Sequence, residues 1–540
     1  MDSIRIKNLR SLRDTGKIKL KPLTILVGKN SSGKSTFLRF FPLMKQTLMT
    51  KRNEPILWYE KDYVDFGSFH ESINRGVDSD ESILFEFKFN SFIDPDYRES
   101  KIPVTVSIEF NENSYKSIKI ALANNLYIEM KTRKDRPHLS LYINGKAQDA
   151  SVIVFNADNQ SLIPNMRILK ENRTAKEEEL NIVPLLSFQT YFREKLRLLF
   201  DKHRQSYFLF EDYFNESHAL NTVQGDFDSV IEEVEKLFHY LLHDGVEDLE
   251  EIELIESRET QFLNFLKKEP PNIKKEIGNF FVLSLWENIL DNINEEIATN
   301  FKNVHYIAPL RASAQRYYRI QGLSVSEIDS QGENIPMMLN HMSYRETTQF
   351  KKWVYENFEF EISTAISSGH ISLQISFDKI NYLNLADTGF GYSQILPIIV
   401  LMWKVINSVE ELSTNRRVSK DDSYDKKVEN KNFYVIIEQP ELHLHPAMQA
   451  ELTDLFINCI NVAKQNNIEL KIIIETHSEI IVNRVGKKIF QDEISEQDVN
   501  LLMFGDNEKN NHIDTKIESV KYNADGILEG WPIGFFYPED

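Results

Sequence analysis

Apolar and polar residues alternate with a period of two through much of the first third of the chain. The alternation is clearest in residues 83–89, 104–110, 118–122 and 139–143. This period is typical of strands that have one face in a core and one in solvent, and such strands usually pair antiparallel. The pattern therefore predicts an antiparallel sheet within residues 80–156.

A different spacing follows, with apolar residues three and four positions apart between residues 170 and 301. Clear examples are residues 230–242 and 280–297. This spacing is typical of amphipathic helices, so residues 157–302 are predicted to form a helical insertion. Within it, the strongly acidic segment 244–259 fits a solvated helix or loop.

Short, continuously apolar runs form the third pattern. They lie at residues 23–27, 304–308, 433–437 and 472–474. Runs of this length without alternation favour strands buried on both faces, as in a parallel sheet of an α/β protein. Ligands of such sheets bind at the carboxyl ends of the strands, so the polar residues that follow these runs are the first candidates for a site.

The run at 23–27 leads directly into a glycine-rich loop at residues 28–36, which fits the phosphate-binding pattern G-x-x-x-x-G-K-[ST]. An apolar helix start follows, and that helix is expected to end or kink near Pro42. Backbone N–H groups and the helix dipole would favour a phosphate group here. Lys34 is expected to reach the outer phosphates, and Ser35 to hold Mg²⁺. The predicted nucleotide-binding residues are Gly28, Asn30, Ser31, Ser32, Gly33, Lys34, Ser35 and Thr36.

Two further apolar strands deliver polar groups at their carboxyl ends. Glu438 follows the run at 433–437 and is predicted to bind Mg²⁺ together with Ser35, directly or through water. Gln439 or Glu441 is expected to position the attacking water. His477 follows the next run and is expected to hydrogen-bond to the γ-phosphate. Together, Glu438, Gln439, Glu441 and His477 are the predicted catalytic residues.

A second glycine-containing turn precedes a long apolar segment. It holds Gly389, Gly391, Ser393 and Gln394. Such a turn fits a second phosphate-binding helix N-terminus, and equally a plain glycine turn before a buried helix.

Composition and charge narrow the class of protein. The chain has 540 residues, more than one ordinary core supports, and a net charge of −19. This charge argues against coating of nucleic acid through the overall field. The single cysteine, Cys459, excludes a disulfide framework and fits a buried thiol in a reducing cytoplasm. The charged segment 410–432 lacks apolar spacing and is expected to be a mobile surface loop.

No segment is predicted to span a membrane or direct secretion. The N-terminus has no apolar core of a signal peptide. The most apolar stretch, residues 395–406, contains Pro397 and Lys404. A soluble cytoplasmic protein without a membrane partner is expected.

The order of these motifs resembles that of the ABC-type ATPases, in the branch of structural-maintenance, recombination-mediator and OLD-family proteins. The resemblance implies bound ATP and Mg²⁺. It also implies that Gly389, Gly391, Ser393 and Gln394 form the signature motif, which caps ATP on the loop of a second subunit in a head-to-tail dimer or higher oligomer. His477 resembles the switch histidine.

The resemblance bears on two further features of the sequence. His443 and His445 lie where the family has a dimer-contacting loop, so they are expected to be interface or structural groups rather than metal ligands. Glu438 stands where the family has aspartate and Gln439 where it has the catalytic glutamate. An amide cannot act as a base, so hydrolysis is expected to be slow unless Glu441 substitutes. Gln46 and Asp65 are the two candidates for the Q-loop residue.

Three stretches also resemble bacterial defence-type AAA ATPases with a DUF3696 segment at the C-terminus, and they lie at residues 64–69, 306–311 and 530–536. The chain is thus predicted to be an α/β ABC-ATPase head, a mixed sheet with a phosphate-loop core plus an antiparallel β subdomain, with a large helical insertion. The predicted domains are 1–156 and 303–500 for the two parts of the head, 157–302 for the insertion and 501–540 for the DUF3696-like segment.

The function that follows is an ATP-dependent dimeric switch in antiphage defence, resembling Septu-type systems, with a separate effector such as an HNH nuclease or toxin. No intrinsic nuclease is expected, because the 63 residues after His477 lack clustered Asp-x-Asp carboxylates. Two alternatives stay open. One is a non-hydrolysing nucleotide sensor. The other is a repair ATPase that clamps DNA, with contacts from Arg311, Arg316, Tyr317 and Tyr318, although a structural role for the arginine after a strand is favoured.

Overall fold

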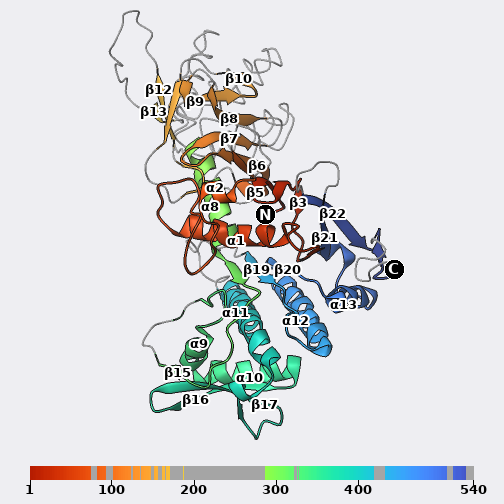
Figure 1. The fold of residues 1–540 in the computed structure, drawn as a ribbon. Coiled ribbons are helices and arrows are strands. Elements are labelled where there is room, and N and C mark those ends of the chain that lie inside the picture. The colour runs from red at the N-terminus through yellow and green to blue at the C-terminus, as the bar shows by residue number, and fades with distance from the viewer. Residues whose placement is uncertain are drawn as a thin grey trace, which may run out of the picture. The chain divides into compact units, whose positions relative to one another are not determined.

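The computed structural model divides into two compact units (Figure 1). Unit 1 comprises residues 1–3, 51–55 and 84–298, and unit 2 comprises 4–50, 56–83 and 299–540. The described residues are 1–74, 82–92, 101–122, 126–133, 136–147, 151–155, 161–164, 166–170, 186–187, 286–320, 325, 327–418, 432–506 and 515–530.

Unit 1 is built on an antiparallel sheet, which confirms the sheet predicted from the alternation. Its strands run in the order β13-β12-β11-β9-β8-β7-β6-β5, and β10 pairs with β9. Cross-strand pairs such as Val106 with Ile120 and Ile108 with Ile118 are fully or almost fully buried. The strands are β5 (Ile83–Phe92), β6 (Lys101–Phe110), β7 (Tyr115–Ala121), β8 (Tyr127–Arg133), β9 (Arg136–Ile143), β10 (Lys146–Ala147), β11 (Ser151–Phe155), β12 (Met166–Lys170) and β13 (Leu186–Ser187).

The sheet continues into the region expected to be a helical insertion. Strand β12 pairs with β11 along five residues, and β13 pairs with β12, so the first part of 157–302 is strand rather than helix. The last part is helical as predicted, in α8 (Trp286–Lys302). The predicted helix at 230–242 and the acidic segment 244–259 lie outside the described residues.

Unit 2 contains the predicted buried sheet, in the order β14-β19-β20-β4-β21-β22-β23. The first five strands pair parallel, and β22 and β23 are antiparallel, so the sheet is mixed. The strands are β14 (Val304–Ile307), β19 (Phe433–Glu438), β20 (Leu470–Glu475), β4 (Leu23–Gly28), β21 (Val499–Asp506), β22 (Thr515–Tyr522) and β23 (Leu528–Glu529). The boundary expected after residue 500 falls inside β21, because that strand pairs with β4 from Val499 to Phe504.

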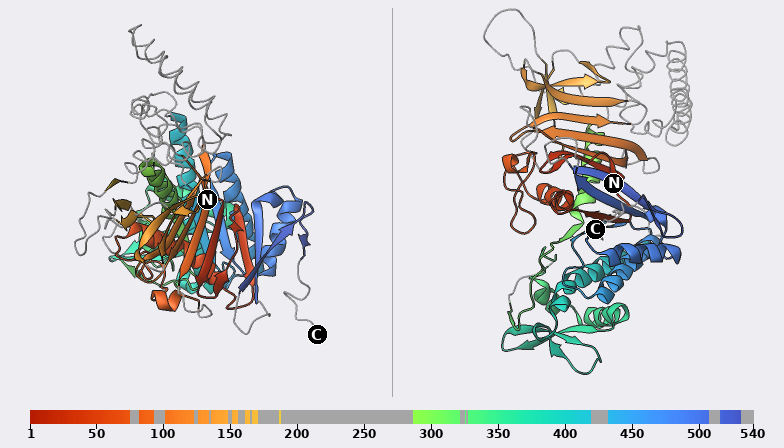
Figure 2. Two further views of the ribbon diagram at one scale, coloured as in Figure 1. Left: turned by 90° about the horizontal axis from the view of Figure 1, so that it is seen from above. Right: turned by 45° about the vertical axis from the view of Figure 1, so that its right-hand side comes forward.

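The two faces of this sheet are covered by different helices (Figures 1 and 2). On one face, α1 (Lys34–Met49) stacks the ring of Phe41 on Tyr434 of β19, with ring centroids 6.0 Å apart. On the other, Val435 and Ile437 join the core formed by α11 and α12. The remaining helices are α2 (Phe69–Ser72), α9 (Ile335–His341), α10 (Tyr344–Phe358), α11 (Phe390–Val418), α12 (Pro446–Gln465) and α13 (Glu479–Phe490), with 3₁₀ turns η2 (Leu385–Asp387) and η4 (Glu496–Asp498).

The helix after the glycine loop was expected to end or kink near Pro42, and it continues through this proline to Met49. A proline removes one helical hydrogen bond. Here the surrounding residues Phe40, Phe41, Leu43 and Met44 are all fully buried. Their burial offsets the lost bond, and the helix is held by its packing rather than by its own propensity.

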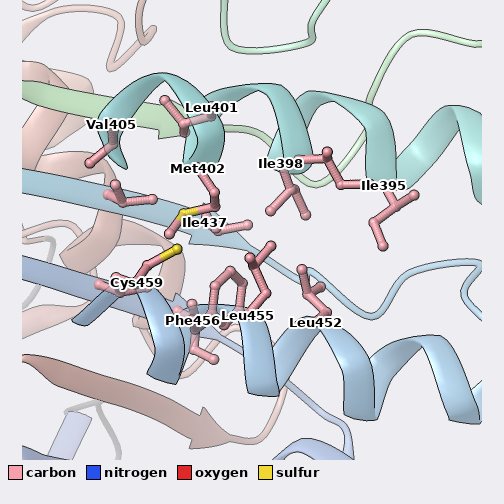
Figure 3. Packing of buried hydrophobic residues seen from close by; sticks show 14 of the residues in the cluster. Ile395, Ile398, Leu401, Met402, Val405, Ile437, Leu452, Leu455, Phe456 and Cys459 are labelled. Carbon is pink, nitrogen blue, oxygen red and sulfur yellow. The ribbon is translucent and has the colours of Figure 1, made fainter. Parts of the chain in front are cut away.

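The long helix α11 lies within a hydrophobic core cluster of unit 2 (Figure 3). Residues of α11 such as Ile395, Met402 and Val405 face α12 and β19. The buried thiol of Cys459, from α12, belongs to the same cluster. By length and composition alone, residues Phe390–Glu410 would suffice to cross a membrane, but 78% of this window is buried inside the protein, as in a core helix. The helix runs to Val418, so the first part of the predicted loop 410–432 is helical, and 419–431 lies outside the described residues.

Further strands belong to unit 2. Near the N-terminus, β1 pairs antiparallel with β2 and also pairs with β3. After α8, β17 pairs with β15, β16 and β18, next to α9 and α10. Helix α10 begins at a capping box in which Ser343 and Glu346 each bond to the other's backbone N–H. These strands are β1 (Ser3–Leu9), β2 (Leu12–Asp14), β3 (Ile18–Lys19), β15 (Tyr318–Arg319), β16 (Glu361–Ser367), β17 (His370–Ser376) and β18 (Leu383–Asn384).

Candidate functional site

The glycine loop connects β4 to α1 at the carboxyl edge of the parallel sheet. Gly33 is the N-cap of α1, with φ 95°, and no side chain caps the helix. The first turn carries no acidic residue. The N–H groups that a helix leaves unbonded at its start are therefore available to an anion, and the helix dipole favours one.

Two glycines in this loop are required by space as well as by backbone angle. Gly28 has φ 145°, and a Cβ there would lie 2.1 Å from the carbonyl oxygen of Phe504 in β21. A Cβ at Gly33 would lie 2.7 Å from Ser11 Oγ. The loop thus fits tightly against β21 and the N-terminal hairpin, which hold its backbone in place.

Lys34 is buried and turned back onto the loop. Its Nζ donates to the carbonyl oxygens of Gly28 and Lys29, at 2.9 and 2.7 Å, and lies 3.7 Å from Glu475 Oε1. Burial lowers the pKa of Lys34. A phosphate group would replace these carbonyl partners with a charged one, so the contact with the outer phosphates stays a prediction for this lysine.

The other predicted loop residues divide by exposure. Asn30 and Ser31 are exposed, whereas Ser32 and Thr36 are buried. Ser31 has a left-handed φ of 64°. The Ser32 carbonyl accepts a 2.8 Å hydrogen bond from Thr515 Oγ1, so strand β22 also supports the loop.

Glu438 lies at the carboxyl end of β19, as predicted, but its carboxylate is already paired. Arg39 of α1 donates to it through Nε and Nη2, at 2.7 and 3.0 Å. The hydroxyl of Tyr306 donates to Oε1 at 2.7 Å. The pairing with Glu438 raises the pKa of Arg39. The sequence-based reasoning did not find Arg39 or Tyr306 as partners of this carboxylate.

Glu475 is the residue that sequence-based reasoning missed as a site residue. It ends β20 in register with Glu438, is 3% exposed, and accepts a 2.7 Å hydrogen bond from the hydroxyl of Ser35. Burial raises the pKa of Glu475, and the nearby charge of Glu438 acts in the same direction. Its position at the end of an apolar strand could have identified Glu475 from the sequence, because the same feature identified Glu438.

The polar residues after the two strands converge. The backbone N–H of Gln439 donates to the Glu475 carbonyl at 2.9 Å, and Gln439 has a left-handed φ of 44°. Glu441 Oε1 accepts a 2.7 Å bond from the backbone N–H of His477. Its Oε2 is buried and has no hydrogen-bond partner among the described residues. Burial also raises the pKa of Glu441, which means that its carboxyl group loses its proton less readily than an exposed one.

His477 is on the solvent side of this group and is exposed. Partial desolvation, and then the charge of Lys34, lower the pKa of His477. A neutral imidazole at this place keeps one donor and one acceptor for a ligand.

The second glycine turn ends where α11 begins. Gly391 and Ser393 lie in the first turn of α11. A Cβ at Gly391 would lie 2.9 Å from the His443 carbonyl, whereas Gly389 has open space around it. Ser393 is 7% exposed, and its hydroxyl donates to the Phe390 carbonyl. Gln394 is buried and donates to the Arg311 carbonyl at 3.1 Å.

The arginines considered for DNA binding are engaged within unit 2. Arg311 is 5% exposed and donates to the carbonyls of Gln394, Glu438 and Gln439. It therefore connects the start of α11 to the end of β19. Arg316 pairs with Asp387, and the hydroxyl of Tyr318 accepts from the backbone of Gln315, while Tyr317 is exposed.

The remaining candidates have structural partners. Gln46 is fully buried and bonds to Leu57 and Val64 through both ends of its amide. Asp65 accepts from the backbone of Gly67. His445 is the N-cap of α12, and the ring of His443 lies edge-to-face with Phe390. No group of three or more His, Cys, Asp and Glu side chains that could hold a metal ion occurs in the described part of the chain.

Comparison with known proteins gives a family match over most of the chain. The model of the family described as "AAA ATPase domain" matches residues 1–482. A search of curated proteins finds no match.

Solved structures with low similarity are heads of SMC proteins. One is the Smc head domain from Pyrococcus furiosus, with an extended coiled coil and bound to the C-terminal domain of ScpA. It has 10% identity and a TM-score of 0.33, with 96% of each chain covered. Another is the SMC head domain from Thermotoga maritima, with 9% identity and a TM-score of 0.33, covering 96% of this chain and 98% of that one. TM-scores of this size do not establish a shared fold.

Proposed function

The chain belongs to the AAA ATPase domain family, and on this premise we propose that it is a slowly hydrolysing, ABC-type ATPase that acts as a nucleotide-dependent dimeric switch. ATP binds at residues 28–36 of one subunit and is capped by Gly389, Gly391, Ser393 and Gln394 of a second. Binding draws two copies together, and hydrolysis or release separates them.

One observation carries the nucleotide site. The uncapped start of α1 lies at the carboxyl edge of a parallel sheet, and Lys34, Glu438 and Glu475 are all buried there. Buried charged groups beside an open helix N-terminus are costly for a purely structural junction. A phosphate group with its cation would compensate Lys34 and Glu475, whereas Glu438 already pairs with Arg39 and Tyr306.

The donor set of this site suits Mg²⁺. The hydroxyl of Ser35 lies 2.7 Å from a buried carboxylate, and a second carboxylate ends the neighbouring strand. Oxygen donors of this kind are the ligands that Mg²⁺ prefers. When bound, the ion would neutralise charge on the phosphates. Ser35 and a carboxylate at a strand end would hold it.

Slow hydrolysis follows from the groups that can activate water. Gln439 has an amide and cannot accept the proton of an attacking water. Glu441 is the available substitute, since its Oε2 is buried without a partner among the described residues. The pKa of Glu441 is raised by burial, which makes it a better base than an ordinary exposed carboxylate. The proposed role of His477, whose backbone N–H donates to Glu441, is a hydrogen bond to the outermost phosphate.

The biological role that we propose is antiphage defence, in which the dimer controls a separate effector such as an HNH nuclease or toxin. This role rests on the sequence resemblance described above. A DNA clamp is supported less, because Arg311 and Arg316 are both engaged with groups of unit 2. A non-hydrolysing sensor would have the same site and would differ only in lacking phosphate release.

The test is to measure nucleotide binding, oligomeric state and phosphate release on the same preparations. Lys34→Ala should abolish ATP binding, and unchanged affinity would refute the site. Ser393→Arg should leave ATP binding intact but block ATP-driven dimers in light scattering. Dimers that form normally in Ser393→Arg would refute capping by the second subunit. Co-purification with a nuclease or toxin, lost when ATP is withheld, would support the defence role.

A further inference from the structure

Two carboxylates lie at the ends of adjacent strands at this site, and each contacts a different kind of side chain on α1. Glu438 of β19 and Glu475 of β20 are in register. Across from them, Ser35 and Arg39 are four positions apart and so share one face of α1. The helix presents a hydroxyl to Glu475 and a guanidinium to Glu438, at 2.7 Å in both cases.

The charge of Glu438 is fully compensated without a metal ion. Both of its oxygens accept from Arg39, and Oε1 also accepts from Tyr306. A two-bond contact of this kind is the strongest that a carboxylate makes with a side chain. For Glu438 to bind a cation, it would have to give up at least part of this pair inside a buried site.

The charge of Glu475 is compensated only in part. Oε2 accepts from the neutral hydroxyl of Ser35. Oε1 lies 3.7 Å from Lys34 Nζ, beyond a hydrogen bond, and that ammonium donates instead to two loop carbonyls. Glu475 is almost completely buried and has the carboxylate of Glu438 on the neighbouring strand, so, among the described residues, no cation hydrogen-bonds to its charge within the site.

We propose that Glu475, rather than Glu438, is the carboxylate that binds Mg²⁺ together with Ser35. This inference rests on the proposed function, since the ion arrives with ATP. Glu438 instead joins Arg39 and Tyr306 in fixing α1 against β19. The assignment departs from the expectation based on motif position alone, which gave the ion to Glu438.

Glu475 and Glu438 differ in their suitability as Mg²⁺ ligands because of their contacts with α1, which the sequence motif does not show. The ligand of Mg²⁺ must be free to turn toward the ion and must lie next to the hydroxyl that also binds it. Glu475 meets both conditions through its contact with Ser35. Glu438 meets neither, because Arg39 holds it one helical turn further along α1.

The experiment measures metal binding apart from catalysis. Purified full-length protein is saturated with a non-hydrolysable ATP analogue, and Mn²⁺ binding is followed by the loss of the free-ion signal in electron paramagnetic resonance. Glu475→Gln should weaken Mn²⁺ binding by about tenfold or more. The matched variant Glu438→Gln should weaken it by less than about threefold. Affinity for the analogue in EDTA should stay close to that of the unmodified protein in both variants.

Each outcome decides the assignment. Normal Mn²⁺ binding by Glu475→Gln, or a larger loss in Glu438→Gln, overturns the inference and leaves the nucleotide site standing. Analogue binding without any Mn²⁺ binding by the unmodified protein overturns it as well. Failure of the unmodified protein to bind the analogue refutes the proposed function itself. If Glu475→Gln does not fold, Glu475→Asp retains the charge but withdraws it from Ser35, and it should show the same selective loss of Mn²⁺.

Discussion

Arg39 donates to both carboxylate oxygens of Glu438, through Nε at 2.7 Å and Nη2 at 3.0 Å. The two residues lie 399 positions apart in the chain, on α1 and on the end of β19. Glu438 is almost completely buried, and Arg39 is one-third exposed. The pair therefore ties the phosphate-loop helix to the strand that carries the catalytic candidates.

Breaking this pair from one side should be costly. Arg39→Ala leaves a buried carboxylate without its cation and should lower the free energy of unfolding by about 3 kcal/mol. Arg39→Lys keeps the charge but loses the two-bond geometry, and should fall between Arg39→Ala and the unmodified protein. Chemical denaturation followed by circular dichroism measures both. Equal stability of Arg39→Ala and the unmodified protein would mean that Glu438 is not buried as described.

The first glycine of the loop should tolerate no side chain. A Cβ at Gly28 would lie 2.1 Å from the Phe504 carbonyl, so Gly28→Ala must displace the loop or β21. ATP affinity should fall by about tenfold or more. The matched control is Gly505→Ala, next to Phe504 in the same strand, where a Cβ meets nothing within 4 Å. That variant should bind ATP normally, and a similar loss in both variants would contradict the argument from space.

Strand β22 should contribute to nucleotide binding through Thr515. Its hydroxyl lies 2.8 Å from the Ser32 carbonyl and 3.1 Å from the Ser11 carbonyl, and it supports the loop from behind. Thr515→Val retains the shape but removes the donor, which should weaken ATP binding by about fivefold. Thr515→Ser restores the hydroxyl and should recover most of the affinity. Fluorescent-nucleotide titration of both variants tests this, and equal affinities would exclude a role for the bond.

The sequence predicted the parts of the fold that depend on local pattern. Alternation identified β5, β6, β7 and β9 of the antiparallel sheet, and uniform apolar runs identified β4, β14, β19 and β20. The strand, glycine loop and helix around residues 28–36 were predicted correctly because they are contiguous in the chain. In each case the signal lies within a few residues and needs no knowledge of distant contacts.

The missed features depend on contacts between distant segments. Glu475 differs from an ordinary strand end only through Ser35, which lies 440 positions earlier. Arg39 occurs in a helix where nothing in the sequence marks it as a partner of Glu438. The helix runs past Pro42 because its neighbours are buried on all sides, and local propensity favours the opposite. The pattern of residues within one segment does not show which distant residue each side chain will contact.

The stability contributed by Glu327 should depend on pH in a defined direction. Burial alone would raise its pKa, but His305 and Lys45 outweigh it and lower the pKa of Glu327 to about 2, from an ordinary value of 4.5. A carboxyl group with a lowered pKa stabilises the fold above its unfolded pKa, and this stability disappears as the pH falls through the folded one. The stability difference between the unmodified protein and Glu327→Gln should be constant near neutral pH and should shrink between about pH 4.5 and pH 2.

Denaturation at several pH values checks this dependence. Near neutral pH, Glu327→Gln should be less stable by about 2 kcal/mol, because the buried Lys45 loses its charged partner. Glu54→Gln, at an exposed position, is the control and should match the stability of the unmodified protein near neutral pH. A difference that grows as the pH falls would reverse the sign and contradict the lowered pKa.

At Gly486, helix propensity favours a substitution by alanine, whereas close packing opposes it. The structure predicts that packing has the larger effect on stability. It lies within α13, where alanine is favoured over glycine by about 1 kcal/mol in an open helix. A Cβ there would lie 2.4 Å from the Gly526 carbonyl and 3.3 Å from the ring of Tyr522. Because the obstacle is backbone, Gly486→Ala should destabilise the protein by about 1–3 kcal/mol despite the gain in propensity. Thermal or urea denaturation decides the sign, and a stabilised Gly486→Ala would show that the turn at Gly526 does not pack against α13.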